Sequence, residues 1–263
     1  MAWIRKHLLL FAALVVLGYL LIPNLIVAIF SFNKPRGRYN YEWNEFSIDA
    51  WLNPCGNPGI CEALGLSLRI GFTASLVATI LGTLVAFALG RHRFRGRSAT
   101  NLLIFMPMAT PEVVMGSSLL TLFVMAGIPS GAMNITIAHI MFCLSFVVVA
   151  VKARVSSLDP RLEEAAADLG ATPLQTFLRV TLPLAAPGIA AGALLAFSLS
   201  FDDYIITNFN ASPSSITFPM YVWGAAQRGT PVEIFVVGTV MFLLALFIVI
   251  IGQILSARRE RQA

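Results

Sequence analysis

The chain has 263 residues, of which 57% are hydrophobic and only 12% are charged, and its net charge at pH 7 is +5. Its mean hydropathy of +0.80 excludes an ordinary soluble domain. The composition predicts an all-α integral membrane protein with a single transmembrane domain over residues 1–263, because a spanning helix satisfies its own backbone polar groups within the bilayer.

Six apolar stretches have the length of roughly 20 residues that a helix needs to span the hydrocarbon core. The first is expected to be retained, because its apolar run exceeds the roughly 7 to 15 residues found in a signal peptide. The core of the domain is expected over about residues 60–260. The six predicted spans cover approximately residues 8–30, 66–90, 102–126, 132–151, 185–208 and 233–255.

Basic residues predict the orientation in the cell inner membrane. Most of the 18 lysines and arginines precede the first span, follow the sixth, or lie between the second and third and between the fourth and fifth spans. The positive-inside rule therefore places both termini and the loop at residues 152–184 in the cytoplasm, although a cluster from Lys34 to Arg38 opposes it. The positive charge thus reflects topology and attraction to membrane lipid, and it does not indicate nucleic acid binding.

The three cysteines divide between a loop and a span. Cys55 and Cys61 share the first external loop, where an oxidising compartment allows a disulfide, and two unpaired thiols remain an equal alternative. Cys143 lies in the fourth span and is expected to pack as a small hydrophobic residue.

Residues 163–183, EEAAADLGATPLQTFLRVTLP, predict two short helices between the fourth and fifth spans. Asp159 is a suitable N-cap for the first helix, and Gly170 is expected to end it in the left-handed conformation. The helical period gives this first helix one apolar stripe, which consists of Leu162, Ala165, Ala166 and Leu169.

The second short helix is expected to begin at Thr172, with Gln175 completing a capping box, and to end as Leu182 meets Pro183. A helix that lies on lipid usually carries basic residues on its polar face. Here the polar face is acidic, which favours docking to a basic protein partner over the alternative of a helix resting on the lipid surface. The acidic face is formed by Glu163, Glu164 and Asp168.

Glu164-Ala165-Ala166, followed by Gly170 and by Val180 before Leu182-Pro183, resembles the Glu-Ala-Ala loop of binding-protein-dependent ABC importer permeases. Val180 replaces the isoleucine of that family and preserves an apolar contact. Six spans with this loop between the fourth and fifth are similar to the family over nearly the whole chain. The resemblance implies that the two helices couple the chain to a cytoplasmic ATPase through Glu163, Glu164, Ala165, Ala166, Asp168, Gly170 and Pro183.

The chain is not expected to be an enzyme. None of its three lysines stands in a phosphate-binding G-x-x-x-x-G-K-[ST] motif, so no cofactor is expected in this chain, and ATP and Mg are expected in partner ATPase subunits. The histidines show neither metal-ligand nor nucleophile spacing, so no metal or catalytic residue is predicted. His139 is expected to be a packed histidine in the fourth span.

Three acids lie within the predicted spans. Glu112 is near the middle of the third, and Asp202 and Asp203 are towards the outer end of the fifth. Ionisable residues at such depth usually line a cavity or pathway, and the alternative is a structural pairing with arginine or backbone donors of a neighbouring helix. Because no lysine or arginine lies inside a predicted span, a charged partner is expected only from a sister subunit or the substrate.

Prolines and glycines in two spans indicate local departures from plain helix packing. Pro107 and Pro111 flank the segment before Glu112 and are expected to break the helix and free carbonyls towards a pathway. Gly188 and Gly192 are expected to allow close approach of a second helix. Ordinary packing of membrane helices is the alternative for both pairs.

Three segments, at residues 106–116, 199–209 and 218–234, resemble the corresponding parts of the spermidine/putrescine permeases within this family. The resemblance implies the import of polyamines, whose several positive charges suit a pathway lined with carboxylates. Tyr221 and Trp223 offer cation–π faces near the outer mouth, although aromatic residues at a membrane interface are often anchors. Iron and thiamine are the alternative cargoes.

The resemblance also implies the partners: an ATPase dimer, a second related permease and an extracytoplasmic binding protein. A secondary cation transporter is the rival class, in which the acids relay protons or sodium, and it predicts inverted repeats that are not evident here. An intramembrane enzyme is a further rival, and it lacks candidate catalytic groups.

Overall fold

The computed structural model describes residues 2–260, without the side chains of residues 2–6, 253 and 255–260. Within this range the chain is helical, with no β-strand and one isolated bridge between Asn33 and Phe46. It forms two compact units, Met1–Glu62 with Tyr221–Ala263 and Ala63–Met220. The domain boundaries and the cytoplasmic placement of both termini stay predictions, and part of each terminus lies outside the described residues.

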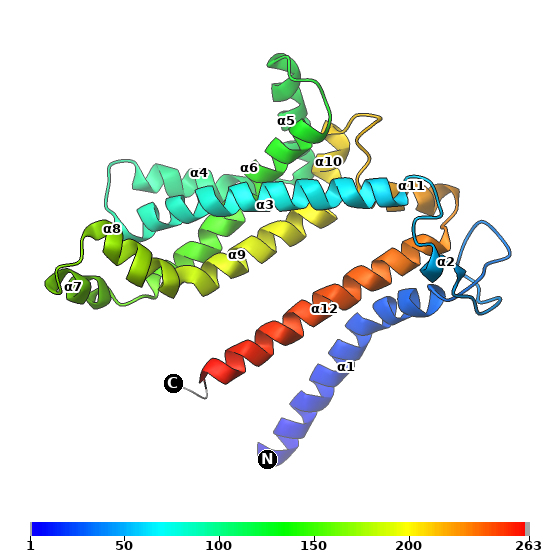
Figure 1. Ribbon diagram of the computed structural model, residues 1–263, viewed down its shortest axis with the longest axis horizontal. Helices are drawn as coiled ribbons and strands as arrows, with labels where there is room; N and C mark the ends of the chain where they lie inside the picture. The colour runs from blue at the N-terminus through cyan, green and yellow to red at the C-terminus, as the bar shows by residue number, and fades with distance from the viewer. Residues whose placement is uncertain (1, 261–263) are drawn as a thin grey trace. The chain divides into compact units, whose positions relative to one another are not determined.

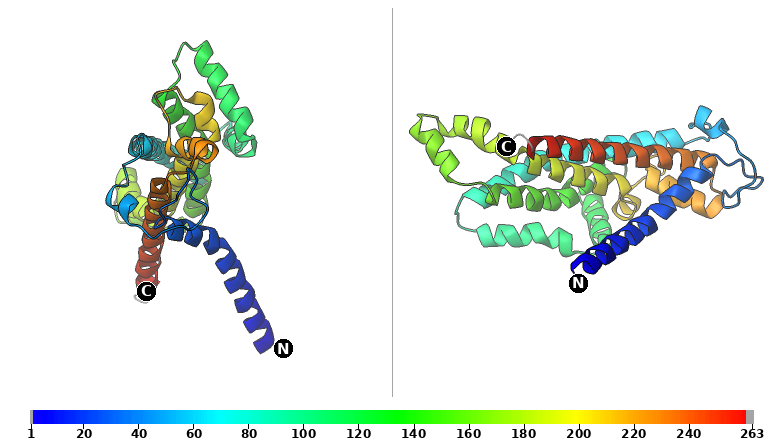
Figure 2. Two further views of the ribbon diagram at one scale, coloured as in Figure 1. Left: turned by 90° about the vertical axis from the view of Figure 1, so that its right-hand side faces the viewer. Right: turned by 90° about the horizontal axis from the view of Figure 1, so that it is seen from below.

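Unit 1 is built on two long helices, α1 (Ala2–Phe30) and α12 (Val232–Glu260), which pack against each other at one end. Figures 1 and 2 show them meeting beside their connecting loops and separating towards the chain ends. Most described side chains of α1 are exposed large hydrophobics, such as Leu8 at 65% and Phe11 at 66%. Such a helix suits a bilayer, where lipid covers its apolar surface.

The loop between α1 and the short helix α2 (Asp49–Leu52) forms a cap that buried hydrogen bonds hold together. Its centre is the buried Asn33, whose amide donates to Asn40 Oδ1 and to the Glu42 carbonyl, both at 2.7 Å. The backbone N–H of Asn40 donates to Thr230 Oγ1 at 2.9 Å, which joins the loop to the segment before α12. Buried amides that satisfy backbone groups in this way fix a loop that has no strands.

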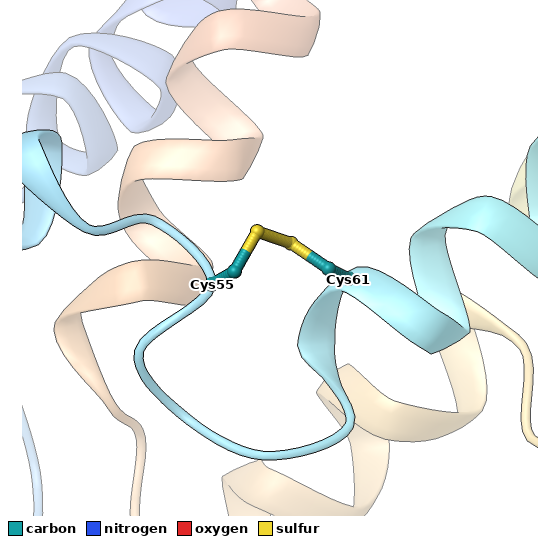
Figure 3. The surroundings of a disulfide bond; sticks show 2 residues. All are labelled: Cys55 and Cys61. Carbon is teal, nitrogen blue, oxygen red and sulfur yellow. A yellow bond between two sulfur atoms is a disulfide. The ribbon is translucent and has the colours of Figure 1, made fainter.

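Cys55 and Cys61 form a disulfide across the turn that leads into α3 (Ile60–Arg91), as Figure 3 shows. Of the two alternatives that the sequence left open, the structure has the disulfide. Cys143 is the free cysteine of the described chain, and it is buried as predicted.

Unit 2 is organised around α6 (Ala132–Ser156), whose buried residues lie on all sides of the helix. Its main partner is α9 (Leu182–Asp202), and the core between the helices includes Phe142, Val147 and Val151 of α6. In Figure 1, the short helices that precede α9 lie at one end of this unit, while α5 and α10 lie towards the other.

Glycines permit the close helix approach that the sequence predicted. A Cβ at Gly188 of α9 would overlap the side chain of Arg154, and one at Gly192 would touch Val147 and Val151 of α6 at 3.5 Å. On α3, a Cβ at Gly82 would come within 2.7 Å of Val147 Cγ1. The backbones of α3 and α9 therefore both approach α6 at distances that a larger residue would obstruct.

The described residues include five helices long and apolar enough to span a membrane, or six if one bent helix pair is counted as a single span. The third predicted span is this pair, and the helix break that the sequence predicted at Pro111 is present, whereas the one expected at Pro107 is not. Helices α4 (Arg97–Ala109) and α5 (Glu112–Met125) meet at 109°. The break is at Pro111, because a proline drives the preceding residue, Thr110, into the extended conformation, whereas Pro107 lies inside α4.

The predicted end of the second short helix at Pro183 is also wrong. Helix α8 (Pro173–Thr176) continues through a π-helical turn, η1 (Phe177–Thr181), directly into α9. A proline has no N–H, and its ring collides with the carbonyl four residues earlier in a tight α-helix. The wider π turn just before Pro183 relieves this conflict, so the helix continues. At its other end α9 stops at Asp202, short of the predicted 208, and α10 (Ile205–Asn210) follows.

Candidate functional site

The first candidate element is the hairpin of α7 (Arg161–Asp168) and α8, which lies where the sequence predicted two short helices. Gly170 ends α7 with a φ of +81°, a conformation that glycine adopts without strain. Thr172 and Gln175 form the predicted capping box. The carboxylate of Asp159 accepts the N–H of Arg161 at 3.0 Å, while Pro160 takes the cap position one residue later than expected.

Glu163 on α7 faces the body of unit 2. Its carboxylate pairs with Arg91 at the end of α3, with Nε and Oε1 3.3 Å apart, and it accepts a hydrogen bond from Thr181 Oγ1 at 3.1 Å. Arg91 also donates to the carbonyl of Leu158 at 3.3 Å. These contacts join α7 to α3 and to η1, so Glu163 fixes the position of the hairpin within the chain.

The outward side of the hairpin is exposed. Leu169 is 90% exposed and Leu174 66%, and the carboxylates of Glu164 and Asp168 are exposed beside them. Ala165 is exposed and Ala166 is partly buried. Leucines exposed to this extent next to uncovered acids are typical of a surface that another protein covers.

A cavity of about 490 Å³ lies between the end of α3 and the hairpin. Apolar groups dominate its walls, with Arg91 and Glu163 contributing an ion pair. The apolar and aromatic residues of its lining are Phe87, Ala167, Ala171, Pro173 and Phe177.

The second candidate element consists of two helix breaks in unit 2, one between α4 and α5 and one between α9 and α10. Glu112 is the first residue of α5, directly after the break at Pro111, and its side chain is exposed. A carboxylate in the first turn of a helix is stabilised by the N-terminal end of the helix dipole. Helix α5 packs against α10, where a Cβ at Gly116 would meet the backbone of Ile206 at 3.3 Å. Both breaks are therefore joined by direct helix contact.

The two neighbouring aspartates at the second break have different environments. Asp202 ends α9 with an exposed side chain, whereas the side chain of Asp203 is only 4% exposed. Asp203 Oδ2 lies 3.2 Å from His139 Nε2 and accepts hydrogen bonds from the backbone N–H and the hydroxyl of Thr207, both at 2.8 Å. Of the two alternatives for Asp203, the structure has the structural pairing with donors of neighbouring helices, and these donors are backbone N–H groups, a hydroxyl and a histidine.

The aromatic candidates lie on α11 (Phe218–Arg228), in the part that belongs to unit 1. The Tyr221 hydroxyl donates to Asn57 Oδ1 at 2.7 Å, and Trp223 is 57% exposed. Burial and the nearby Glu233 carboxylate raise the pKa of the Tyr221 phenol, so it remains a donor at neutral pH. A cavity of about 460 Å³ in this unit is lined by residues that include Asn33, Lys34, Asp49, Asn53 and Glu233.

Comparison with known families gives the class of this chain. Residues 78–262 match the family described as the binding-protein-dependent transport system inner membrane component. The chain belongs to this family. It is thus a multi-pass permease of the inner membrane, and its Glu-Ala-Ala motif is typical of the family.

Individual relatives extend the similarity over nearly the whole permease. The spermidine/putrescine transport system permease protein PotC of Haemophilus influenzae is 36% identical over 246 residues, which cover 94% of this chain and 95% of the relative. The putrescine transport system permease protein PotI of Escherichia coli is 38% identical over 251 residues, with coverages of 93% and 89%.

A solved structure supports the fold of the permease. It is a bacterial alginate ABC transporter in complex with an alginate pentasaccharide-bound periplasmic protein, and it matches with a TM-score of 0.71. The match covers 97% of this permease and 94% of that chain, at 18% sequence identity. At this identity the likeness concerns the fold alone.

Sequence reasoning about the permease missed two long-range pairings, Arg91 with Glu163 and His139 with Asp203. His139 is buried as predicted, but its polar partners were not foreseen. One signal was present: Ser200, Asp203 and Thr207 recur at helical spacing within an apolar segment. A polar stripe inside a span indicates a buried polar partner on another helix.

Proposed function

We propose that this permease is the transmembrane subunit of an ATP-driven importer that carries polyamines, spermidine or putrescine, across the inner membrane. The observation that carries the proposal is the identity of 36% and 38% to permeases named for these two cargoes, over more than nine tenths of the chain. Exposed carboxylates at two helix breaks support it, because polyamines are cations with two or more charges.

The proposed pathway contains Glu112 and Asp202, which both remain exposed in this chain. Helix breaks inside a membrane are tolerated where the backbone is covered by protein or lines a water-filled cavity. A cation passing these points would meet a carboxylate at each break. Asp203 lies at the same break as Asp202, and its buried contacts hold that part of the pathway in place. Tyr221 and Trp223 are proposed as cation–π contacts near the outer mouth.

The partner subunits follow from the same proposal. The exposed face of the α7–α8 hairpin is proposed to dock into a cytoplasmic ATPase dimer, with Glu164 and Asp168 meeting basic residues and the leucines meeting apolar ones. A second related permease would complete the pathway, and an extracytoplasmic binding protein would deliver the cargo. The Cys55–Cys61 disulfide supports an extracytoplasmic cap, because disulfides persist in oxidising compartments.

The test is spermidine uptake into proteoliposomes that contain the complete transporter. Asp202→Asn keeps the size of the side chain and removes one negative charge, and we expect uptake efficiency to fall about 5- to 150-fold, the equivalent of about 1–3 kcal/mol. The matched control is Glu45→Gln, which removes an exposed carboxylate from the cap of unit 1 and should leave uptake within about twofold.

Two further measurements separate the rival explanations. Uptake should stop when ATP is depleted and continue in the presence of an uncoupler, and the reverse would identify a secondary transporter. Uptake of iron or thiamine without any uptake of polyamines would contradict the proposed cargo. Equal uptake by the wild type and by Asp202→Asn would remove Asp202 from the pathway.

A further inference from the structure

The α9–α10 break holds two consecutive aspartates in opposite environments, and this arrangement has a specific cause. Asp203 adopts an extended backbone, with φ −64° and ψ 126°, so the chain turns between Asp202 and Tyr204. The turn buries the Asp203 carboxylate while that of Asp202 stays exposed. Whatever holds Asp203 in place therefore also determines the direction of Asp202.

The Asp203 carboxylate organises the start of α10. Its oxygens accept the backbone N–H groups of Ile206 at 3.3 Å and of Thr207 at 2.8 Å. The first N–H groups of a helix have no partner within the helix, and a carboxylate near that end satisfies them and the helix dipole together. Asp203 thus lies between the end of α9 and the start of α10, and its carboxylate caps the first N–H groups of α10.

His139 connects this break to α6. Its Nδ1 lies 2.7 Å from Ser200 Oγ on α9, and its Nε2 lies 3.2 Å from Asp203 Oδ2 and 3.0 Å from Thr207 Oγ1 on α10. One assignment of hydrogens satisfies the cluster: Ser200 donates to Nδ1, Nε2 donates towards Asp203 and Thr207, and Thr207 donates to Asp203. One imidazole therefore contacts the chain on both sides of the break.

The order serine, histidine, aspartate does not make this cluster a nucleophilic site. Ser200 is 4% exposed, His139 1% and Thr207 fully buried, and neither of the two cavities described above includes any of them. A nucleophile must reach a substrate, and these atoms have no access to one. Their contacts can only hold helices in place.

We propose that His139 is a positioning residue for cargo recognition. By holding Asp203 and both sides of the α9–α10 break, it directs the neighbouring Asp202 carboxylate into the cation pathway. This inference rests on the proposed function, since it assigns to Asp202 the contact with the polyamine. It gives the two aspartates different roles: Asp202 meets the cargo, and Asp203 sets the geometry.

The experiment is a double-mutant cycle on the complete transporter in proteoliposomes, with the KM for spermidine uptake as the readout. His139→Leu removes both ring nitrogens, and we expect the KM to rise about tenfold, as expected for the loss of a well-oriented charged contact. In an Asp202→Asn background the same change should raise the KM less than about twofold, because the charge being positioned is already absent.

Two further variants distinguish positioning from simple stabilisation. His139→Gln retains an N–H that can reach Asp203, and it should restore most of the wild-type KM. Thr136→Val removes a hydroxyl that bonds only within α6, to the Ala132 carbonyl, and it should leave the KM unchanged. A cluster that only stabilised the fold would lower the amount of assembled transporter and leave the KM of the remainder unchanged.

The outcomes separate this inference from the proposed function. If Asp202→Asn itself leaves uptake unchanged, Asp202 is removed from the proposed pathway and this inference fails with it. If Asp202→Asn impairs uptake while His139→Leu leaves the KM unchanged, or raises it equally in both backgrounds, only the inference is overturned. Should His139→Leu not assemble, Thr207→Val removes two of the hydroxyl contacts, and the same comparison applies to it, with an expected rise in KM of about threefold.

Discussion

Two adjacent glutamates on α7 are expected to respond differently to the loss of charge, because Glu163 faces the protein and Glu164 faces outward. Glu163→Gln keeps an oxygen for Thr181 but removes the ion pair with Arg91, whose side chain is 16% exposed against 35% for Glu163. Exposed pairs contribute about 0–1 kcal/mol, and breaking a buried pair costs about 3–5 kcal/mol. For this intermediate burial we expect a loss of about 1–2 kcal/mol in the free energy of unfolding.

The first measurement is thermal unfolding of the purified permease. A chain of this size shifts its melting temperature by about 2–4 °C per kcal/mol, so Glu163→Gln should lower it by about 2–8 °C. Glu164→Gln should shift it by no more than about 2 °C, since substitutions at exposed positions usually change stability by less than about 0.5 kcal/mol.

The second measurement is the affinity of the permease for its ATPase subunit, titrated onto permease in nanodiscs. Glu164→Gln should weaken binding about 10- to 150-fold, the equivalent of a lost charge-assisted contact of about 1.5–3 kcal/mol. Glu45→Gln, on the cap of unit 1, is the matched control and should bind normally. Equal melting temperatures for the Glu163 and Glu164 variants would refute the inward assignment, and wild-type affinity of Glu164→Gln would refute the docking assignment.

Three further predictions test packing, the disulfide and topology. Gly82→Ala should destabilise the permease by about 1–3 kcal/mol in thermal unfolding, because its Cβ would lie 2.7 Å from a valine side chain, whereas Gly192→Ala, with contacts at 3.5 Å, should be neutral within about 1 kcal/mol. Cys55→Ser should lower the free energy of unfolding by about 2 kcal/mol in denaturant titrations, and a reductant should have the same effect on the wild type. Cysteines introduced by Ser214→Cys and Leu169→Cys should react with a membrane-impermeant maleimide from the outer and the cytoplasmic side respectively, and labelling of both from one side would contradict the predicted topology.

The sequence predicted the helices well because length and hydropathy decide them, but of the helix breaks and ends that it predicted at Pro107, Pro111 and Pro183 the structure has the one at Pro111. Pro111 breaks a helix and Pro183 does not. At Pro111 the preceding Thr110 becomes extended, whereas at Pro183 a π turn makes room for the ring. The difference depends on how the surrounding helices pack, and that information is not local in the sequence.

In the candidate site, too, the features set by neighbouring residues were predictable from the sequence, and those set by distant residues were not. The turn at Gly170 and the capping box at Thr172 are set by residues within a few positions, and both were predictable. The contact between His139 and Asp203 joins residues 64 positions apart. Pairings at that distance depend on the order in which spans pack, so the sequence identified Asp203 as an important acid without identifying its partner.

The two candidate elements are connected by one continuous helical segment. Helices α8, η1 and α9 run without a break from the hairpin to Asp202, and the 21 residues of α9 alone extend roughly 30 Å. Glu163 fixes α7 to the start of this segment through Thr181, and His139 holds its far end against α6. On the proposed function, an ATPase that moves the hairpin would shift α9 along α6. That shift would alter the hydrogen bonds of His139 to Ser200 and Asp203, and it would thereby change the direction of Asp202.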